Sequence, residues 1–238
     1  MYCSEDPTQA ISQALSKHRF RPGVDEFKSS NKMKENPRNV ALRDEVGHIL
    51  RQFGQIGVLV VPNEQELGAE AFKLLSKMSA HEDILSDTHE VFFDEGLFAS
   101  AKQGNDLVKS HGGFTRYKLH FEKDSKIIAG IQLADLAAHT CAIMLSDEMG
   151  LIKKTVKAGE NSGYEPDLDI ELGFELWAGL RYNFLSEPAE LPNDWDGNQE
   201  AFLANVEPFG LHISRNSEKK LRKAALKRFG QMYLGCIH

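Results

Sequence analysis

The amino-acid sequence predicts an α/β fold, in which helices pack on a sheet. Short apolar runs of strand length alternate with longer segments of helical periodicity through the middle of the chain, in the order β-α-β-β-α. Of the 238 residues, 41% are hydrophobic and 26% are charged, which excludes a chain that is disordered throughout. The length fits one large domain, or one domain with an elaborated tail.

Two helices are expected before the first well-defined strand. Apolar residues at helical spacing predict a helix over Asp6–His18, and an Arg-Pro-Gly turn breaks it. A second helix is predicted over Asn39–Phe53 on the same grounds. The β-branched run Ile56–Val61 then predicts a strand that is buried on both faces.

Four further elements complete the predicted core. Gln65–Met78 has the apolar spacing of an amphipathic helix, and His89–Asp94 predicts a short strand that ends on a carboxylate. Thr115–Phe121 alternates apolar and polar residues, as a half-buried strand does. Ile131–Leu145 predicts an apolar helix with a few polar residues, and most of this helix should be buried.

The pattern loosens after Gly150. We expect a core over residues 1–150 and a loop-rich, mostly helical C-terminal extension over residues 151–238 that packs on the core. Within the extension, helices are predicted around Ile170–Phe184 and over Ser217–Leu234, which is basic and amphipathic.

Charge and cysteine content exclude several classes of protein. A net charge of −7 argues against a surface built throughout for nucleic acid, although a local basic groove is compatible with it. Cys3, Cys141 and Cys236 show no C-x-x-C spacing, which disfavours a disulfide framework and a zinc ribbon. No apolar run reaches the roughly 18 residues of a membrane span, and the first residues are polar, so we expect a cytoplasmic protein without a membrane partner.

A polar stripe crosses the apolar helix predicted at Ile131–Leu145. Gln132, Asp135 and His139 fall at spacings that place them on one helix face. A carboxylate in such apolar surroundings is costly unless it meets a cation or hydrogen-bond donors. Asp135 is therefore interpreted either as a ligand of a divalent metal or an acid/base group, or as a structural aspartate paired with a basic residue or a helix N-terminus.

Asp94 closes the predicted HEVFFD strand. Open α/β sheets place their sites at the carboxyl ends of central strands. Mg²⁺ takes oxygen ligands, usually one or two carboxylates together with waters and substrate phosphates. Asp94 and Asp135 would supply such a pair if the strand and the helix are neighbours. The alternative is an ordinary turn over Asp94-Glu95-Gly96.

Two charged clusters accompany these aspartates. Lys126 precedes the apolar helix and could neutralise a phosphate or a carboxylate, although a polar turn explains it equally well. Glu26 and Lys28 form a second cluster with Asp25, for which a solvated loop is the alternative interpretation. No P-loop, G-x-G-x-x-G or G-x-S-x-G motif is present in the sequence.

Three ordered elements resemble a known family. The stretch F-E-K-D-S-K-x-x-A-G-I-Q-L-A-D-L-A-A, residues 121–138, resembles the signature of the prokaryotic family called domain of unknown function 3800, which shows a DSK…G-hydrophobic-QLAD pattern. E-F-K-S-S at Glu26–Ser30 resembles the E-x-K-x-S element of that family, and V-F-F-D-E at 91–95 resembles its central strand ending in Asp. The resemblance covers roughly residues 5–145.

The resemblance implies a ribonuclease H-like fold, a mixed sheet flanked by helices with a cluster of carboxylates. It further implies binding of Mg²⁺ (or Mn²⁺) and hydrolysis of phosphodiester bonds in nucleic acid by a two-metal scheme. Carried onto this chain, the implied acidic set is Glu26, Asp94 and Asp135, with Lys28, Ser125 and Lys126 beside it.

The chain departs from the family pattern at its start. Family members begin with a strand that carries a D-E-S-G element, whereas this chain starts at Met1 with residues that resemble the end of that hairpin. We therefore expect an N-terminally truncated or degenerate copy with an unpaired sheet edge, and such an edge favours a homodimer. Two functions remain open, a metal-dependent nuclease and a catalytically inactive binding or interaction module.

Overall fold

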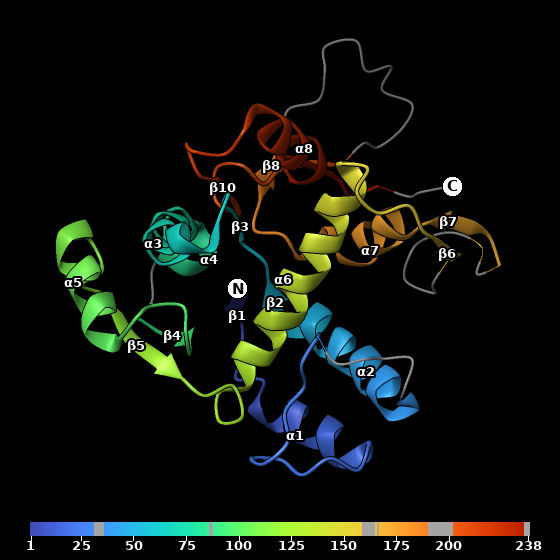
Figure 1. Cartoon of the computed structure of the whole chain (residues 1–238), viewed down its shortest axis with the longest axis horizontal. Coiled ribbons are helices and arrows are strands. Elements are labelled where there is room, and N and C mark those ends of the chain that lie inside the picture. Colours follow the sequence, from blue (N-terminus) through green and yellow to red (C-terminus); the bar gives the residue numbers. More distant parts are fainter. Residues whose placement is uncertain (31–35, 86–87, 159–164, 166, 190–201, 236–238) are drawn as a thin grey trace.

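The computed structural model describes residues 1–30, 36–85, 88–158, 165, 167–189 and 202–235. Helices and short strands follow one another through these ranges, so the predicted α/β class is confirmed (Figure 1). The α-helices in them are α1 (Thr8–Lys17), α2 (Pro37–Phe53), α3 (Leu67–Met78), α4 (Glu82–Leu85), α5 (Ala101–His111), α6 (Ala129–Glu148), α7 (Leu172–Leu180) and α8 (Lys219–Phe229). Two short 3-10 helices are η2 (Glu64–Glu66) and η3 (Arg181–Asn183).

The described strands are short and form several small sheets. These strands are β1 (Tyr2–Cys3), β2 (Gly54–Gln55), β3 (Val58–Val60), β4 (His89–Asp94), β5 (Tyr117–Lys123), β6 (Thr155–Lys157), β7 (Asp169–Glu171), β8 (Glu187–Pro188), β9 (Leu203–Asn205), β10 (Leu211–Ile213) and β11 (Gln231–Tyr233). The pairs β3–β10 and β4–β5 are parallel, whereas β1–β2 and β6–β7 are antiparallel and β11-β9-β8 forms a third antiparallel sheet. In the described ranges no strand pairing joins β3 to β4.

Most predicted elements are present, with ends shifted by a few residues. The strand His89–Asp94 has its predicted bounds, and the helix predicted at Ile131–Leu145 is the longer α6. The predicted C-terminal helix is α8, but the chain passes into β11 after Gly230 instead of remaining helical. Cys236 lies outside the described residues.

The predicted direct succession of two strands in the middle of the chain is wrong, because α5 lies between β4 and β5. Sequence periodicity missed α5 since its residues are mostly polar and Gly104 is its buried residue. Capping residues at the two ends of α5 mark the helix instead. Ser100 Oγ accepts a hydrogen bond from Gln103 N at 3.2 Å, and Gly112 adopts a positive φ of 72° after the last turn. β4, α5 and β5 thus form a βαβ unit with parallel strands.

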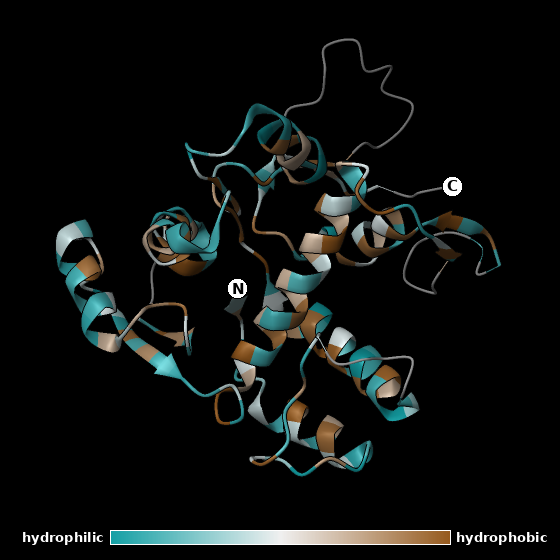
Figure 2. Ribbon diagram, viewed as in Figure 1, coloured by the Kyte–Doolittle hydropathy of each residue, from teal (hydrophilic) through white to brown (hydrophobic). Residues whose placement is uncertain are grey.

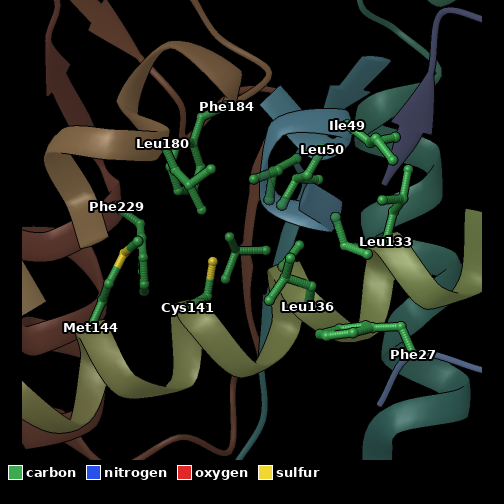
Figure 3. Packing of buried hydrophobic residues seen from close by; sticks show 14 of the residues in the cluster. Phe27, Ile49, Leu50, Leu133, Leu136, Cys141, Met144, Leu180, Phe184 and Phe229 are labelled. Carbon is green, nitrogen blue, oxygen red and sulfur yellow. The ribbon is translucent and has the colours of Figure 1, made fainter. Parts of the chain in front are cut away.

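Helix α6 runs through the middle of the molecule and contacts α2, α7 and α8 (Figure 1). Its apolar residues point into an aliphatic core, and two of them, Leu133 and Met144, are 0% exposed. Figure 3 shows these side chains facing residues of α2 and of the segments around α7 and α8. Burial raises the pKa of Cys141 to about 12, so this thiol behaves as the small core residue that the sequence predicts.

Hydrophobic residues predominate along α7, whereas α8 is mainly hydrophilic (Figure 2).

Helix α6 is long and apolar enough to cross a membrane by length and composition alone, but half of its apolar window is buried inside the protein. A core helix has the same properties.

A second, smaller core consists of aromatic side chains around β4 and β5. Its buried members are Phe72 from α3, Phe93 from β4, Phe121 from β5, and Phe98 and Phe114 from the loops on either side of α5. The Phe93 and Phe121 rings stack at 5.1 Å between centroids. This aromatic cluster attaches the βαβ unit to α3, and in Figure 1 the unit lies at one side of the molecule, away from α7 and α8.

Candidate carboxylate site

The polar stripe of α6 holds a segment of turns and irregular backbone, residues 24–30, by its backbone amides. Gln132 Oε1 accepts a hydrogen bond from Phe27 N at 2.8 Å, and Gln132 Nε2 donates to Ser125 O at 2.7 Å. Asp135 Oδ2 accepts from Ser29 N at 2.8 Å. Gln132 is only 2% exposed, so both of its hydrogen bonds are made away from water. Gln132 and Asp135, which the sequence places on one face of α6, therefore hold residues 24–30 in position.

Phe27 is buried in the core, whereas the side chain of Lys28 is exposed and that of Glu26 is largely covered. Ser125 Oγ donates a hydrogen bond to Glu26 Oε2, and Lys28 Nζ lies 3.2 Å from Glu26 Oε1. The charged cluster near residue 26 is thus anchored to the start of α6 through Ser125, and it is no freely solvated loop.

Asp94 reaches the same region from the end of β4. The β4–β5 register pairs Phe92 with His120 but Asp94 with Lys123, so β5 contains one extra residue, a β-bulge. Glu122 within this bulge has a positive φ of 52°, which is uncommon for a residue other than glycine. Bulges beside functional sites commonly turn a side chain to a new direction, and this one lies directly opposite Asp94.

The carboxylates act on one another electrostatically. Partial burial raises the pKa of Asp94, and the nearby charges of Asp135 and Glu26 raise it further, whereas the hydrogen bond from Glu95 N and the charge of Lys28 lower it. The hydrogen bond and charge of Glu26 raise the pKa of Lys28, with smaller contributions from Asp94 and Asp135. Glu26, Asp94 and Asp135 each contribute to the pKa of Lys28, and we call these three carboxylates the carboxylate site.

Arg43 of α2 flanks this site, and sequence analysis did not identify it. Partial burial lowers the pKa of His139, Arg43 lowers it further, and Asp135 opposes both effects. Burial also lowers the pKa of Arg43, against the charges of Asp44 and Asp135. The Arg43 position carries no signal in the sequence, because an arginine on a helix is most often solvated.

Lys126, the fourth predicted site residue, lies to the outside of this group. Its side chain is exposed, and its backbone N–H donates to Asp124 Oδ1 at 2.8 Å. The pKa of Asp25 is lowered chiefly by its hydrogen bonds from Arg21 and least by Lys126. The structure thus places Glu26 and Asp135 against the neighbouring residues Lys28 and Ser29, and the charges of both raise the pKa of Asp94, whereas Lys126 acts on Asp25.

Glu122 is a further carboxylate that sequence analysis missed. Its Oε2 accepts a hydrogen bond from Gly96 N at 3.2 Å, in the turn that follows Asp94. Its Oε1 is buried and has no hydrogen-bond partner among the described residues. A buried carboxylate oxygen without a donor is costly, and a cation would satisfy it. The polar position of Glu122 in the alternating β5 pattern was the available signal.

These donors suit a hard cation. All are carboxylate oxygens, the ligands that Mg²⁺ and Mn²⁺ prefer. Among the described residues no group of three His, Cys, Asp or Glu side chains is arranged to hold a metal by itself. Mg²⁺ commonly uses one or two protein carboxylates and completes its shell with water and substrate. Asp94 and Asp135 are the two carboxylates that the motif resemblance assigns to such a site.

No family model, curated protein or solved structure matches this chain. The interpretation of the carboxylate site therefore depends on its geometry and on the motif resemblance.

Proposed function

We propose that this chain is a ribonuclease H-like protein whose carboxylate site binds Mg²⁺ or Mn²⁺ and hydrolyses phosphodiester bonds in nucleic acid. One observation carries the proposal: Glu26, Asp94 and Asp135 come from three distant segments and act on the same lysine ammonium. A fold that concentrates negative charge in this way is destabilised by repulsion unless a cation compensates. Asp94 and Asp135 would hold the metal, with Glu26 beside them.

When bound, divalent metal supplies an activated water and stabilisation of the leaving oxygen. Hydrogen bonds within the chain fix the carboxylates of the site. Ser29 N fixes Asp135 through one carboxylate oxygen, and Ser125 does the same for Glu26. Lys28, which is 55% exposed, is placed to contact a substrate phosphate once a metal has neutralised the carboxylates.

Helix α8 supplies the basic surface that a nucleic acid would need. Lys227 and Arg228 are already paired with carboxylates of α6, Glu148 for both and Asp147 for Arg228. The exposed lysines at 219, 220 and 223 make no ion pair within the described ranges and remain available for phosphate contacts.

A second candidate function is a catalytically inactive interaction module. The observation that favours it is that Lys28 already compensates the carboxylates without metal. In that case the ion pairs hold residues 24–30 on α6, and the site is structural.

Cleavage of end-labelled RNA, DNA and RNA–DNA hybrid in Mg²⁺ or Mn²⁺ tests the nuclease proposal. We expect metal-dependent cleavage of at least one of these substrates, which Asp135→Asn and Asp94→Asn each reduce by about 100-fold or more. Asp106→Asn is the matched control, because Asp106 lies on α5 and its carboxylate pairs with Lys109. Absence of cleavage of all three substrates, or equal activity of Asp135→Asn and the control, contradicts the proposal.

A further inference from the structure

A cavity of about 690 Å³ lies beside β4, outside the carboxylate site. Its walls are the N-terminal segment Met1–Thr8, helix α3 and the start of α6, and its remaining side is β4 itself. We call it the β4 groove. Its volume lies within the roughly 300–1,000 Å³ that is usual for binding pockets.

The backbone edge of β4 forms this side of the groove. Five consecutive residues, His89–Phe93, line the cavity. Successive strand residues point to opposite faces: Phe93 belongs to the aromatic cluster, whereas Phe92 stacks on His120 at 4.7 Å. Side chains from the two faces of a strand line the same cavity only where the backbone edge between those faces borders the cavity. The free edge of β4 therefore borders the β4 groove.

That edge has no strand partner in the described part of the chain. β4 pairs with β5 on its other side, and this sheet has two strands. The β4 sequence HEVFFD contains no lysine and no proline, the residues with which proteins commonly block a free edge. Its free N–H and C=O groups are therefore ready to pair with another strand.

The shape of the groove selects a slender occupant. The β4 edge lies between the walls of α3 and of the N-terminal segment, and Tyr2 closes one end with its ring 5.5 Å from that of His89. In a second copy of this protein the β4 edge lies between the same walls. Two such recessed edges cannot meet, whereas a single extended peptide fits between the walls.

The lining also indicates which side chains this peptide carries. The floor is apolar, with Leu74, Met78 and Ile131 among its residues. The exposed carboxylates of Glu5 and Asp6 line the mouth, Glu90 beside them is already paired with Lys118 at 2.7 Å, and no lysine or arginine of the described ranges lines the groove.

We propose that the β4 groove binds an extended peptide segment of a partner protein, which adds to β4 as a strand. The peptide places alternate apolar side chains on the floor, and basic residues at its ends meet the acidic mouth. About five residues, or roughly 17 Å of strand, match the length of the exposed edge. The partner strand runs beside β4 toward Asp94, but its binding requires no metal and no catalysis.

Fluorescence anisotropy of a labelled, end-blocked peptide with the sequence KVIVTVK tests this proposal. We expect saturable binding to the full chain, and slower hydrogen exchange of the His89–Phe93 amides in the complex. The same peptide with proline at its centre, or with glutamate at both ends, should bind at least about tenfold more weakly, a change of 1.4 kcal/mol.

Ala71→Arg places a long side chain in the groove from α3, and we expect it to weaken peptide binding by about tenfold or more. Ala69→Arg, on the exposed face of the same helix, is the control, and the melting temperatures of both variants show that they are folded. Asp135→Asn should bind the peptide normally, which separates this proposal from the nuclease proposal.

Four results would overturn the peptide proposal. The first is no binding by the unmodified chain at millimolar peptide, and the second is equal binding of the proline peptide. The third is a dimer in sedimentation that Ala71→Arg dissociates, since the occupant is then a second copy. The fourth is hydrogen exchange of the His89–Phe93 amides that is unchanged when the peptide is added, because this result excludes β4 as the binding edge.

Discussion

The two cores of this molecule differ in how they are built. The aliphatic core around α6 draws on residues from Ile11 to Met232, that is, on most of the described chain. The aromatic cluster draws only on residues from Phe72 to Phe121 and lies under a two-stranded sheet. Asp135 belongs to the first region and Asp94 to the second. The geometry of the carboxylate site is therefore set by how the smaller region is attached to the larger one.

This difference suggests that the two regions have different stabilities. Contacts between distant segments unfold cooperatively, whereas a local unit with free strand edges opens at lower free energy. The aromatic unit joins α6 through the short connection after β5, which includes Ser125. A cation or substrate that bridges Asp94 and Asp135 would stabilise the smaller region as well as react there.

The largest effect is expected from Leu133→Ala in the aliphatic core. Leu133 is 0% exposed and lies among residues of α2 and α6 (Figure 3). Removing its side chain leaves a cavity and should lower the free energy of unfolding by about 2–5 kcal/mol. Urea denaturation measures this loss. A loss below about 1 kcal/mol would mean that the core around α6 is not the main source of stability.

Gly104→Ala should destabilise the aromatic unit by about 1–3 kcal/mol. A Cβ at Gly104 would lie 2.5 Å from the Phe121 ring, and that ring is packed against its neighbours. Gly179→Ala in α7 is the control, because its Cβ meets no atom within 4 Å. The control should gain up to about 1 kcal/mol from helix propensity. Hydrogen exchange should show the Gly104→Ala loss chiefly in β4 and β5, and a uniform loss would contradict separate stabilities.

Gln132→Met removes the side chain that joins residues 24–30 to α6. Phe27 N and Ser125 O both lose their partner, so we expect a loss of about 1–3 kcal/mol, measured by urea denaturation. Metal binding should weaken as well, because Glu26 is positioned by the same segment. A variant with full stability would show that water replaces these hydrogen bonds without cost.

Asp94→Asn should give the smallest change, a gain of stability at neutral pH. The pKa of Asp94 is raised in the folded protein, so its ionised form is less favourable there than in the unfolded chain. The variant therefore exceeds the unmodified chain in free energy of unfolding most at a pH above the raised pKa of Asp94. This difference disappears as the pH falls below the pKa of an ordinary aspartate. Thermal melts from pH 7 to pH 3 measure it, and a gain that grows in acid would refute the assignment.

Periodicity in the sequence was sufficient for α6 and β4, because their burial patterns are regular. It failed for α5, whose few apolar residues give no clear helical stripe, and for the bulge at Glu122, which depends on the register with β4. The same limit applied to the residues of the carboxylate site. Asp94 and Asp135 were identifiable as carboxylates in structured elements. The motif resemblance also placed Lys28 beside them, whereas Arg43 as a neighbour depends on tertiary packing that no local pattern encodes.

Titration with Mn²⁺, followed by calorimetry and by the paramagnetic resonance signal of the ion, tests the central claim most directly. We predict saturable binding by the unmodified chain, tighter binding by Lys28→Met because the competing ammonium is gone, and at least about tenfold weaker binding by Asp135→Asn. Melting temperatures without metal verify that the variants are folded. If neither the unmodified chain nor Lys28→Met binds Mn²⁺, the carboxylates are structural partners of Lys28 and the metal-dependent account is wrong.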